Sequence, residues 1–180
     1  VAISRDGRRL LFTTTSSRTR VWAFPFDPAS GRIAGQPHPI TDGSTGEADF
    51  DARADGSIVA YRTVRAGRSE LWERSIGAGR ERLLLSSTDW RIAKPLWSPD
   101  GAQLAVGGGD RTIRFFDTAS GKQKRLLKQH ADWVQTVAFS PDGKRLVTAS
   151  IDKTARIWKV HGEESPLILR GHEDTVWSAA

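Results

Sequence analysis

The 180-residue chain contains no cysteine and no methionine, and it has a single tyrosine. Without cysteine it forms neither disulfide bonds nor thiolate metal sites. No run of 18 or more apolar residues occurs and no charged-then-apolar leader opens the chain, so we expect no transmembrane helix. We therefore expect a soluble, cytoplasmic piece of a longer protein, since the first residue is Val1, and stability that comes from packing.

Charge gives little indication of a partner. The net charge of +6 arises from 27 Lys and Arg against 21 Asp and Glu, and the one local cluster is GKQKRLLK at 121–128. No aromatic residues that could stack on bases alternate with these cations. We expect this run to be a solvated strand and loop. We predict no nucleic-acid partner, no membrane partner and no cofactor.

The dipeptide Asp-Gly recurs along the chain at intervals of 49, 45 and 42 residues. An apolar strand precedes each dipeptide, and another follows two residues later. An Asp-Gly between apolar strands predicts a hairpin in which both central residues adopt positive φ. Four similar units therefore follow one another, each marked by its aspartate: Asp6, Asp55, Asp100 and Asp142.

Each unit continues in the same way after its hairpin. An aromatic residue comes sixteen or seventeen positions after the aspartate, on a third expected strand: Trp22, Trp72, Phe116 and Trp158. A fourth strand follows, for example at 82–86 and 125–129. The turn before it also repeats, as DPASGR from Asp27 and DTASGK from Asp117.

Four-stranded antiparallel meanders of 42 to 49 residues, repeated head to tail, are typical of β-propeller blades. In the last unit Val137 and Phe139 are expected on one face and Ala138 on the other, so both faces are apolar. Such a sheet must stack against a neighbour on each side. We predict an all-β protein, a β-propeller segment of four consecutive four-stranded antiparallel blades at about 1–49, 50–94, 95–136 and 137–178.

The stretch 130–160 resembles a blade of the WD-repeat family, through a His before the inner strand, the VAFSPDG strand and turn, SIDKT, and RIWK. In that family a His, a Ser or Thr, an Asp and a Trp form a hydrogen-bonded tetrad that holds one blade together. The resemblance implies this structural role for five candidates: His130, Thr148 or Ser150, Asp152 and Trp158.

The resemblance has limits along the chain. RGHEDTVWSAA at 170–180 repeats KQHADWVQTVA at 128–138 with a 42-residue step, so His172 is expected to begin a fifth blade. The third unit keeps Asp110, but Thr88 stands where the His belongs and Phe116 stands where the Trp belongs. WD-repeat resemblance thus covers about 95–180, whereas residues 1–94 resemble the TolB-like propeller repeat.

The same residue types are also compatible with a catalytic interpretation. His130, Asp152 and a nearby Ser are the components of a nucleophilic triad, but no G-x-S-x-G elbow occurs in the chain. In a blade the same groups bond within one sheet. We therefore predict that the protein is not an enzyme.

Metal and phosphate binding find no support in recognised motifs. His161 with Glu163 and Glu164 sits in an expected loop and lacks a metal-ligand spacing, so we predict no metal site. GGGD at 107–110 and SGK at 120–122 lie in expected strand-to-strand turns, where glycine is needed for its φ. A phosphate loop would need a different spacing between a strand and a helix.

In WD-repeat proteins a partner docks on the face formed by the loop ahead of the inner strand and the turn after the second strand. Aromatic residues and arginines exposed there are typical binding anchors. The resemblance implies these partner-binding positions: Trp133, Gln135, Ile151, Thr175 and Trp177, with Trp90 and Arg91 matching more loosely. The alternative for Trp133 and Trp177 is packing between blades.

Four blades are fewer than the seven or eight of a WD-repeat ring, so the first and last would each leave an apolar face and an unpaired edge. Either the segment belongs to a longer chain, or it forms a homo-oligomer, a dimer that makes an eight-bladed ring.

The resemblance implies a non-catalytic scaffold that binds a protein or peptide partner, as the sensor or docking region of a bacterial signalling protein. The alternative is a propeller that gates the separate catalytic domain of a prolyl oligopeptidase-like hydrolase. A further alternative is an engineered chimera of two kinds of propeller, joined near Pro95.

Overall fold

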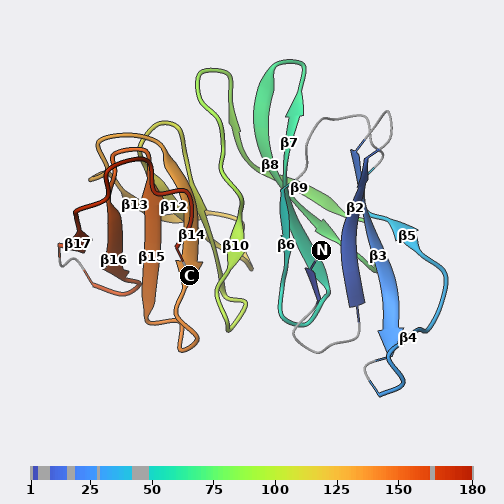
Figure 1. Cartoon of the computed structure of the whole chain (residues 1–180). Coiled ribbons are helices and arrows are strands. Elements are labelled where there is room, and N and C mark those ends of the chain that lie inside the picture. Colours follow the sequence, from blue (N-terminus) through green and yellow to red (C-terminus); the bar gives the residue numbers. More distant parts are fainter. Residues whose placement is uncertain are drawn as a thin grey trace. The chain divides into compact units, whose positions relative to one another are not determined.

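The structure is a computed structural model that describes residues 2–3, 9–15, 19–27, 29–41, 49–162 and 165–179. These residues form strands and connecting turns (Figure 1). They include no helix long and apolar enough to cross a membrane. The chain divides into two compact units, Val1–Thr88 and Asp89–Ala180. Each unit contains two consecutive antiparallel sheets, so the predicted all-β, partial β-propeller fold is confirmed.

The first unit contains two sheets whose strands are neighbours in chain order. The first sheet comprises β1 (Ala2–Ile3), β2 (Arg9–Thr15), β3 (Thr19–Asp27), β4 (Arg32–Ile33) and β5 (His38–Pro39). The second sheet comprises β6 (Phe50–Ala52), β7 (Ile58–Arg65), β8 (Arg68–Ser75) and β9 (Glu81–Ser87).

The first sheet has five strands, one more than predicted, because β4 and β5 both pair with β3. The expected single outer strand is split at Gly35–Pro37. Proline has no N–H to donate to a ladder, so Pro37 interrupts the outer pairing between the two short strands.

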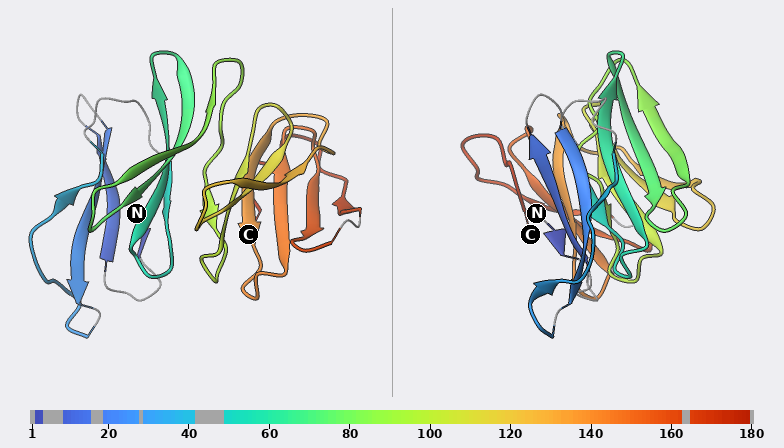
Figure 2. Two further views of the ribbon diagram at one scale, coloured as in Figure 1. Left: turned by 180° about the vertical axis from the view of Figure 1, so that it is seen from behind. Right: turned by 90° about the vertical axis from the view of Figure 1, so that its right-hand side faces the viewer.

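The second unit contains two four-stranded sheets, again in chain order (Figure 2). The third sheet comprises β10 (Leu96–Trp97), β11 (Gln103–Gly107), β12 (Ile113–Asp117) and β13 (Gln123–Leu127). The fourth comprises β14 (Val134–Phe139), β15 (Arg145–Ser150), β16 (Ala155–Lys159) and β17 (Leu167–Leu169). Strand β14 spans the boundary expected at 136–137 between the third and fourth blades. The limits of the blades stay a prediction.

The Asp-Gly hairpins form as predicted, but with a different turn. In the fourth sheet Gly143 N donates to Ser140 O at 2.8 Å, which makes Ser-Pro-Asp-Gly a four-residue turn with glycine last. Only the glycine has positive φ, 69° at Gly143, so the expectation of positive φ at the aspartate as well was wrong. Asp142 instead accepts hydrogen bonds from Ser140 Oγ and the Lys144 amide. The first hairpin, Asp6–Gly7, lies outside the described residues.

Each unit has a core between its two sheets. In the first unit the core residues come from both sheets: Val21, Ala23, Ile40, Phe50, Val59 and Tyr61. In the second unit the same holds for Ala105, Ile113, Phe115, Val134, Val137, Leu146, Trp158 and Val160. Phe115 and Phe139 meet edge to face with 6.3 Å between ring centroids. Consecutive sheets therefore stack face to face within each unit, as the two-faced apolar pattern predicts.

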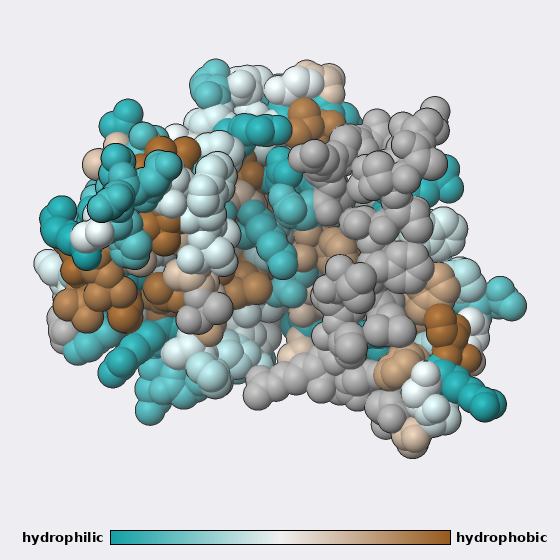
Figure 3. All heavy atoms as spheres, viewed as in Figure 1, coloured by the Kyte–Doolittle hydropathy of each residue, from teal (hydrophilic) through white to brown (hydrophobic). Residues whose placement is uncertain are grey.

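The fourth sheet has a second apolar face. Register places Ala138 opposite Val147, Val147 opposite Ile157, and Ile157 opposite Leu167. This row alternates with the one that contains Leu146 and Trp158, so it lies on the other side of the sheet. Leu167 is 62% exposed, and apolar side chains gather over β16 and β17 in the space-filling view (Figure 3).

Candidate functional site

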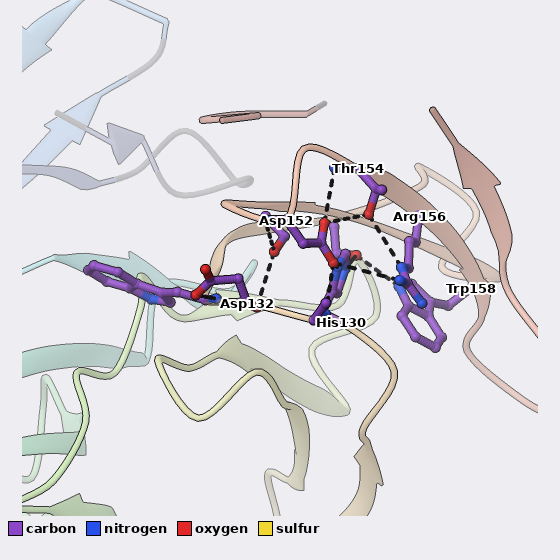
Figure 4. Close-up of polar contacts among 10 residues, drawn as sticks. His130, Asp132, Asp152, Thr154, Arg156 and Trp158 are labelled. Atoms are coloured by element: carbon purple, nitrogen blue, oxygen red, sulfur yellow. Dashed lines mark hydrogen bonds and ion pairs between the residues drawn. The ribbon is translucent and has the colours of Figure 1, made fainter. Parts of the chain in front are cut away.

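The candidate site lies at one end of the fourth sheet, where the segment before β14 meets the turn between β15 and β16 (Figure 4). His130 Nδ1 lies 2.7 Å from Asp152 Oδ2, and its Nε2 lies 2.7 Å from Thr148 Oγ1. Trp158 Nε1 donates to the same threonine hydroxyl at 2.9 Å. Four of the five predicted tetrad residues thus form one chain of hydrogen bonds.

The direction of this chain follows from what each group can donate. An indole N–H only donates, so the Thr148 hydroxyl accepts from Trp158 and gives its single proton to His130 Nε2. The proton of the neutral imidazole is then on Nδ1, where it is donated to Asp152 Oδ2. The histidine tautomer is thereby assigned by the network.

Ser150, the fifth candidate, stands outside this chain. Its hydroxyl donates to the Asp132 carbonyl at 3.1 Å and accepts from the Asp152 amide at 3.1 Å. It therefore ties the turn after β15 to the loop before β14. Of the two alternatives weighed at that position, Thr148 is the residue in contact with His130.

Asp152 accepts more hydrogen bonds than the sequence indicated. Thr154 donates to Oδ1 through both its amide, at 3.0 Å, and its hydroxyl, at 2.5 Å, and the Ala131 amide donates to Oδ2 at 2.9 Å. Burial alone would raise the pKa of Asp152, but these bonds and the one from His130 hold the pKa well below its ordinary value. Asp152 is therefore an anion at neutral pH.

His130 is a neutral, buried residue. Burial lowers the pKa of His130 below its ordinary value; the bond and charge of Asp152 oppose this shift, and Arg156 adds to it. Arg156 Nη2 lies 3.6 Å from Asp152 Oδ2. Sequence reasoning missed Thr154 and Arg156, although an Asp-x-Thr-x-Arg pattern at both 110–114 and 152–156 was a usable signal.

The equivalent end of the third sheet is held differently. Asp110 and Arg114 form an ion pair at 2.6 Å, and the Arg114 guanidinium lies 4.6 Å from the centre of the Trp90 ring. Thr112 donates its hydroxyl to Asp110 at 2.8 Å. Val106 stands 42 residues before Thr148 and has no hydroxyl to relay a hydrogen bond. An arginine stacked on an indole occupies this end of the third sheet.

Six of the predicted partner-binding residues lie on the loops at this end of the second unit, and the seventh, Gln135, lies at the start of β14. Trp177 is 69% exposed, and Arg91 is exposed. Trp133 is half buried, and its indole nitrogen has no hydrogen-bond partner within the described part of the chain. The others are half buried as well: Gln135, Ile151, Thr175 and Trp90.

Two of these loops have the same backbone contacts. The Gly109 amide donates to Arg91 O at 2.8 Å, and the Ile151 amide donates to Trp133 O at 3.0 Å. The second contact lies 42 residues after the first for both its donor and its acceptor. Arg91 and Trp133 therefore hold equivalent places ahead of their inner strands. Trp90, one position before Arg91, is then equivalent to Asp132, one position before Trp133.

The C-terminal segment repeats the entry into the fourth sheet. The Val134 amide donates to Gly108 O at 3.2 Å, and the Val176 amide, 42 residues on, donates to Ser150 O at 3.1 Å. The Thr175 amide donates to Asp174 Oδ1 at 2.7 Å, just as the Trp133 amide donates to Asp132 Oδ1 at 2.7 Å. Residues 174–176 therefore adopt the conformation that precedes an inner strand.

The hydrogen bonds of His130 do not suit a catalytic base. Both ring nitrogens of His130 are used within the sheet, so neither is free to act as a base for a serine. The described residues hold no group of three or more His, Asp or Glu side chains suited to a metal ion. Glu163 and Glu164 lie outside those residues.

The two glycine-containing stretches differ from expectation in one respect. Gly121 has φ 69°, as a turn glycine should. Gly107 instead ends β11, and a Cβ there would lie 2.6 Å from Val134 O. Its role is close approach between the two sheets, so the φ argument was wrong for 107–110.

Residues 82–117 and 121–159 match the family model described as "WD domain, G-beta repeat". The chain carries two adjacent WD40 repeats. Each WD40 match begins with the outer strand of one sheet, β9 or β13, and continues through the inner three strands of the next. His130, Thr148, Asp152 and Trp158 all lie in the second repeat. The TolB-like resemblance of residues 1–94 stays a prediction.

Two curated proteins are similar to part of this chain. The chain is 41% identical over 49 residues to "Probable serine/threonine-protein kinase PkwA" of Thermomonospora curvata, which is 27% of this chain and 7% of that protein. It is 33% identical over 58 residues to "Cell division cycle 20.1, cofactor of APC complex" of Arabidopsis thaliana, which is 32% of this chain and 13% of that protein. The similarity thus spans a small part of either relative.

Proposed function

We propose that this chain is a non-catalytic propeller scaffold that binds a protein or peptide partner on its loop surface. The loop surface is defined by the residues at one end of the second unit: Trp90, Arg91, Trp133, Gln135, Ile151, Thr175 and Trp177. WD40 propellers generally bind protein partners, which supports the proposal.

The observation that carries the proposal is the exposure of Trp177. An indole that is 69% exposed keeps a large apolar area in contact with water, and such residues are common interface anchors. Its neighbour Val176 is bonded to Ser150, which places the tryptophan beside the turn that contains Ile151. This end of the second unit therefore presents an aromatic side chain, Trp177, an aliphatic one, Ile151, and a cationic one, Arg91. Such a surface is suited to a peptide.

The buried hydrogen-bond network supports this surface from beneath. Asp152 binds the Ala131 amide, and the Ile151 amide binds Trp133 O, so the loop and the turn are tied together twice. A rigid loop loses little conformational entropy on binding. We infer that the tetrad arrangement is a positioning device for Trp133 and Ile151.

The setting of this function is also a proposal. The similarity to a protein named as a kinase supports a sensor or docking region of a bacterial signalling protein, located in the cytoplasm. Neither relative described above carries a hydrolase name, so the prolyl oligopeptidase-like alternative and the chimera have no support from them.

We also infer that the isolated segment self-associates. The row Ala138, Val147, Ile157 and Leu167 forms an apolar face on the fourth sheet, and Leu169 beside it is 40% exposed. Burial of such a face is worth roughly 25 cal/mol per Å² of apolar surface. A second copy of this chain offers a sheet of the same kind, which gives the predicted eight-bladed dimer.

Site-specific photocrosslinking in cells tests the partner surface. A photoreactive benzoylphenylalanine is introduced at position 177, and the control carries it at Lys144, which precedes β15 and so lies at the opposite end of that strand from Ile151. The proposal expects a discrete partner adduct from position 177 that is lost in an Ile151→Asp background, and none from position 144. Adducts from 144 alone would overturn it.

A further inference from the structure

A second candidate site lies in the same unit, at the opposite ends of the strands from the loop surface. It is an open cleft of about 520 Å³ between the third and fourth sheets. Lys124 and Arg125 of β13 line one side, and His161, which follows β16, lines another. Gln103 and Asp117, at the start of β11 and the end of β12, complete the polar lining.

A β-bulge brings the two cations to the same cleft. Consecutive side chains of a regular strand point to opposite faces, so Lys124 and Arg125 would normally diverge. Here Phe115 pairs with Arg125 and Phe116 pairs with Gln123, which leaves Lys124 as the extra residue. Bulges redirect side chains and are frequent beside functional sites. Both cations therefore border one cleft.

Arg125 is held in position by the backbone of the neighbouring sheet. Its Nη1 donates to Lys159 O at 2.9 Å and Val160 O at 2.6 Å, and its Nη2 donates to Gly162 O. A guanidinium has five N–H donors, so two remain without a partner among the described residues. These two donors are fixed before any ligand arrives.

Two carboxylates near this cluster are held by hydrogen bonds from neighbouring turns. Asp117 Oδ1 accepts from the amide and hydroxyl of Ser120, at 2.8 Å and 2.5 Å. Asp100, in the neighbouring hairpin, accepts from Ser98 Oγ and the Ala102 amide. The described lining of the cleft thus contains two cations, Lys124 and Arg125, and one carboxylate, Asp117.

We propose that this cleft binds a phosphate monoester of a small molecule. Arg125 supplies its two remaining N–H donors and Lys124 a point charge, while His161 faces them across the cleft. Guanidinium and ammonium groups together are the usual recognition set for a phosphate dianion. The side-chain amide of Gln103 offers a donor and an acceptor for hydroxyl groups on the organic part, and the volume suits a ligand of this size.

This site is separate from the glycine motif considered in the sequence. SGK at 120–122 forms the turn between β12 and β13, and the Lys122 side chain is not part of the lining. Recognition here depends on side chains that a bulge and a neighbouring sheet assemble.

Titration followed by amide NMR of the full 180-residue chain tests the proposal. Inorganic phosphate and glucose 6-phosphate are added separately at constant ionic strength, with potassium chloride as the reference anion. We expect saturable shifts of the His161 and Gly162 amides with both phosphates and tighter binding of the sugar phosphate. Equal affinity for the two would reduce the site to one for free phosphate and overturn the monoester assignment.

Variants separate this site from general surface charge. Lys124→Ala is expected to weaken glucose 6-phosphate binding by about tenfold or more, since one charge-assisted contact is lost. Lys144→Ala removes an exposed lysine of the same unit outside the lining and is expected to leave the affinity unchanged. Arg125→Lys keeps the charge but loses the fixed fork, and should weaken binding as well. If Lys124→Ala and Lys144→Ala weaken binding equally, the cleft is not the site.

Discussion

The hydroxyl of Thr148 and the indole nitrogen of Trp158 lie 2.9 Å apart inside the fourth sheet. Thr148 is fully buried and Trp158 is 2% exposed, so no solvent molecule is available to replace this bond. The same hydroxyl continues the chain to His130. A single buried oxygen thus satisfies two side chains from different segments, and the loop before β14 depends on it.

Thr148→Val should destabilise the protein strongly. Valine keeps the shape but leaves Trp158 Nε1–H and His130 Nε2 buried without partners. Each unsatisfied group costs about 1–3 kcal/mol, so we expect a loss of about 2–4 kcal/mol in the free energy of unfolding. Urea denaturation of the full chain measures it.

Thr148→Ser is the matched control. It keeps the hydroxyl and removes one buried methyl group, so the expected loss is about 1 kcal/mol. If the valine variant were no less stable than the serine variant, the hydrogen-bond chain would contribute nothing measurable.

Stability should fall as the pH is lowered from 7 to 5. The pKa of His130 is lower in the folded chain than the ordinary value of about 6.5, so between the two values the unfolded state binds the proton first. Stability contributed by neutral His130 is therefore present above pH ~6.5 and is lost as pH falls through the lowered pKa. Unfolding free energies at several pH values measure the slope.

Asp152 acts at lower pH. Its pKa is also lowered in the folded state, so its contribution to stability is present above its ordinary pKa near 4 and is lost only in stronger acid.

His130→Gln should flatten the slope of stability between pH 7 and 5, whereas His172→Gln, at an exposed position, should leave that slope as in the parent chain. A slope unaffected by His130→Gln would show that other groups cause it.

Gly107→Ala should destabilise the second unit. Its Cβ would lie 2.6 Å from the Val134 carbonyl oxygen, which is backbone and cannot turn aside. Overpacking of this kind costs about 1–3 kcal/mol. Gly77→Ala is the control, because nothing lies within 4 Å of its Cβ, and it should be neutral or stabilising by less than about 1 kcal/mol. Thermal unfolding of the two variants decides, and equal melting temperatures would refute the close-contact argument.

The isolated chain should be a dimer. Light scattering is expected to give twice the 19.8 kDa mass of one chain. Leu167→Glu places a charge on the uncovered face of the fourth sheet and should shift the mass to that of a monomer. Leu83→Glu is the control: Leu83 is 45% exposed, but it continues the row of Tyr61 and Trp72 on the face that the first sheet covers. A folded monomer in the parent chain would contradict the proposal.

Repeats in the sequence predicted the strands other than the split outer strand of the first sheet. The spacing of Asp100 and Asp142 located two hairpins, and the aromatic residues Phe116 and Trp158 located the third strands, because each strand is specified by local alternation and by its turn. The split of the outer strand near Pro37 was not predicted. Proline breaks a strand through the backbone hydrogen bond that it cannot donate, and the repeat pattern does not reveal this effect.

The candidate site was predictable only in part. A motif indicated His130, Asp152 and Trp158 as one group, yet the choice between Thr148 and Ser150 depended on which hydroxyl lies within hydrogen-bond distance of both rings. Arg125 and His161 could not have been paired from the sequence, because a bulge and an adjoining sheet bring them together.

By itself, the sequence determined the all-β meander and its repeat, because alternation of apolar residues and glycine-containing turns act over a few positions. Only the tertiary structure decided which polar groups satisfy one another and which cations share a cleft, because hydrogen bonds and charges are selected by distance between segments that lie far apart along the chain.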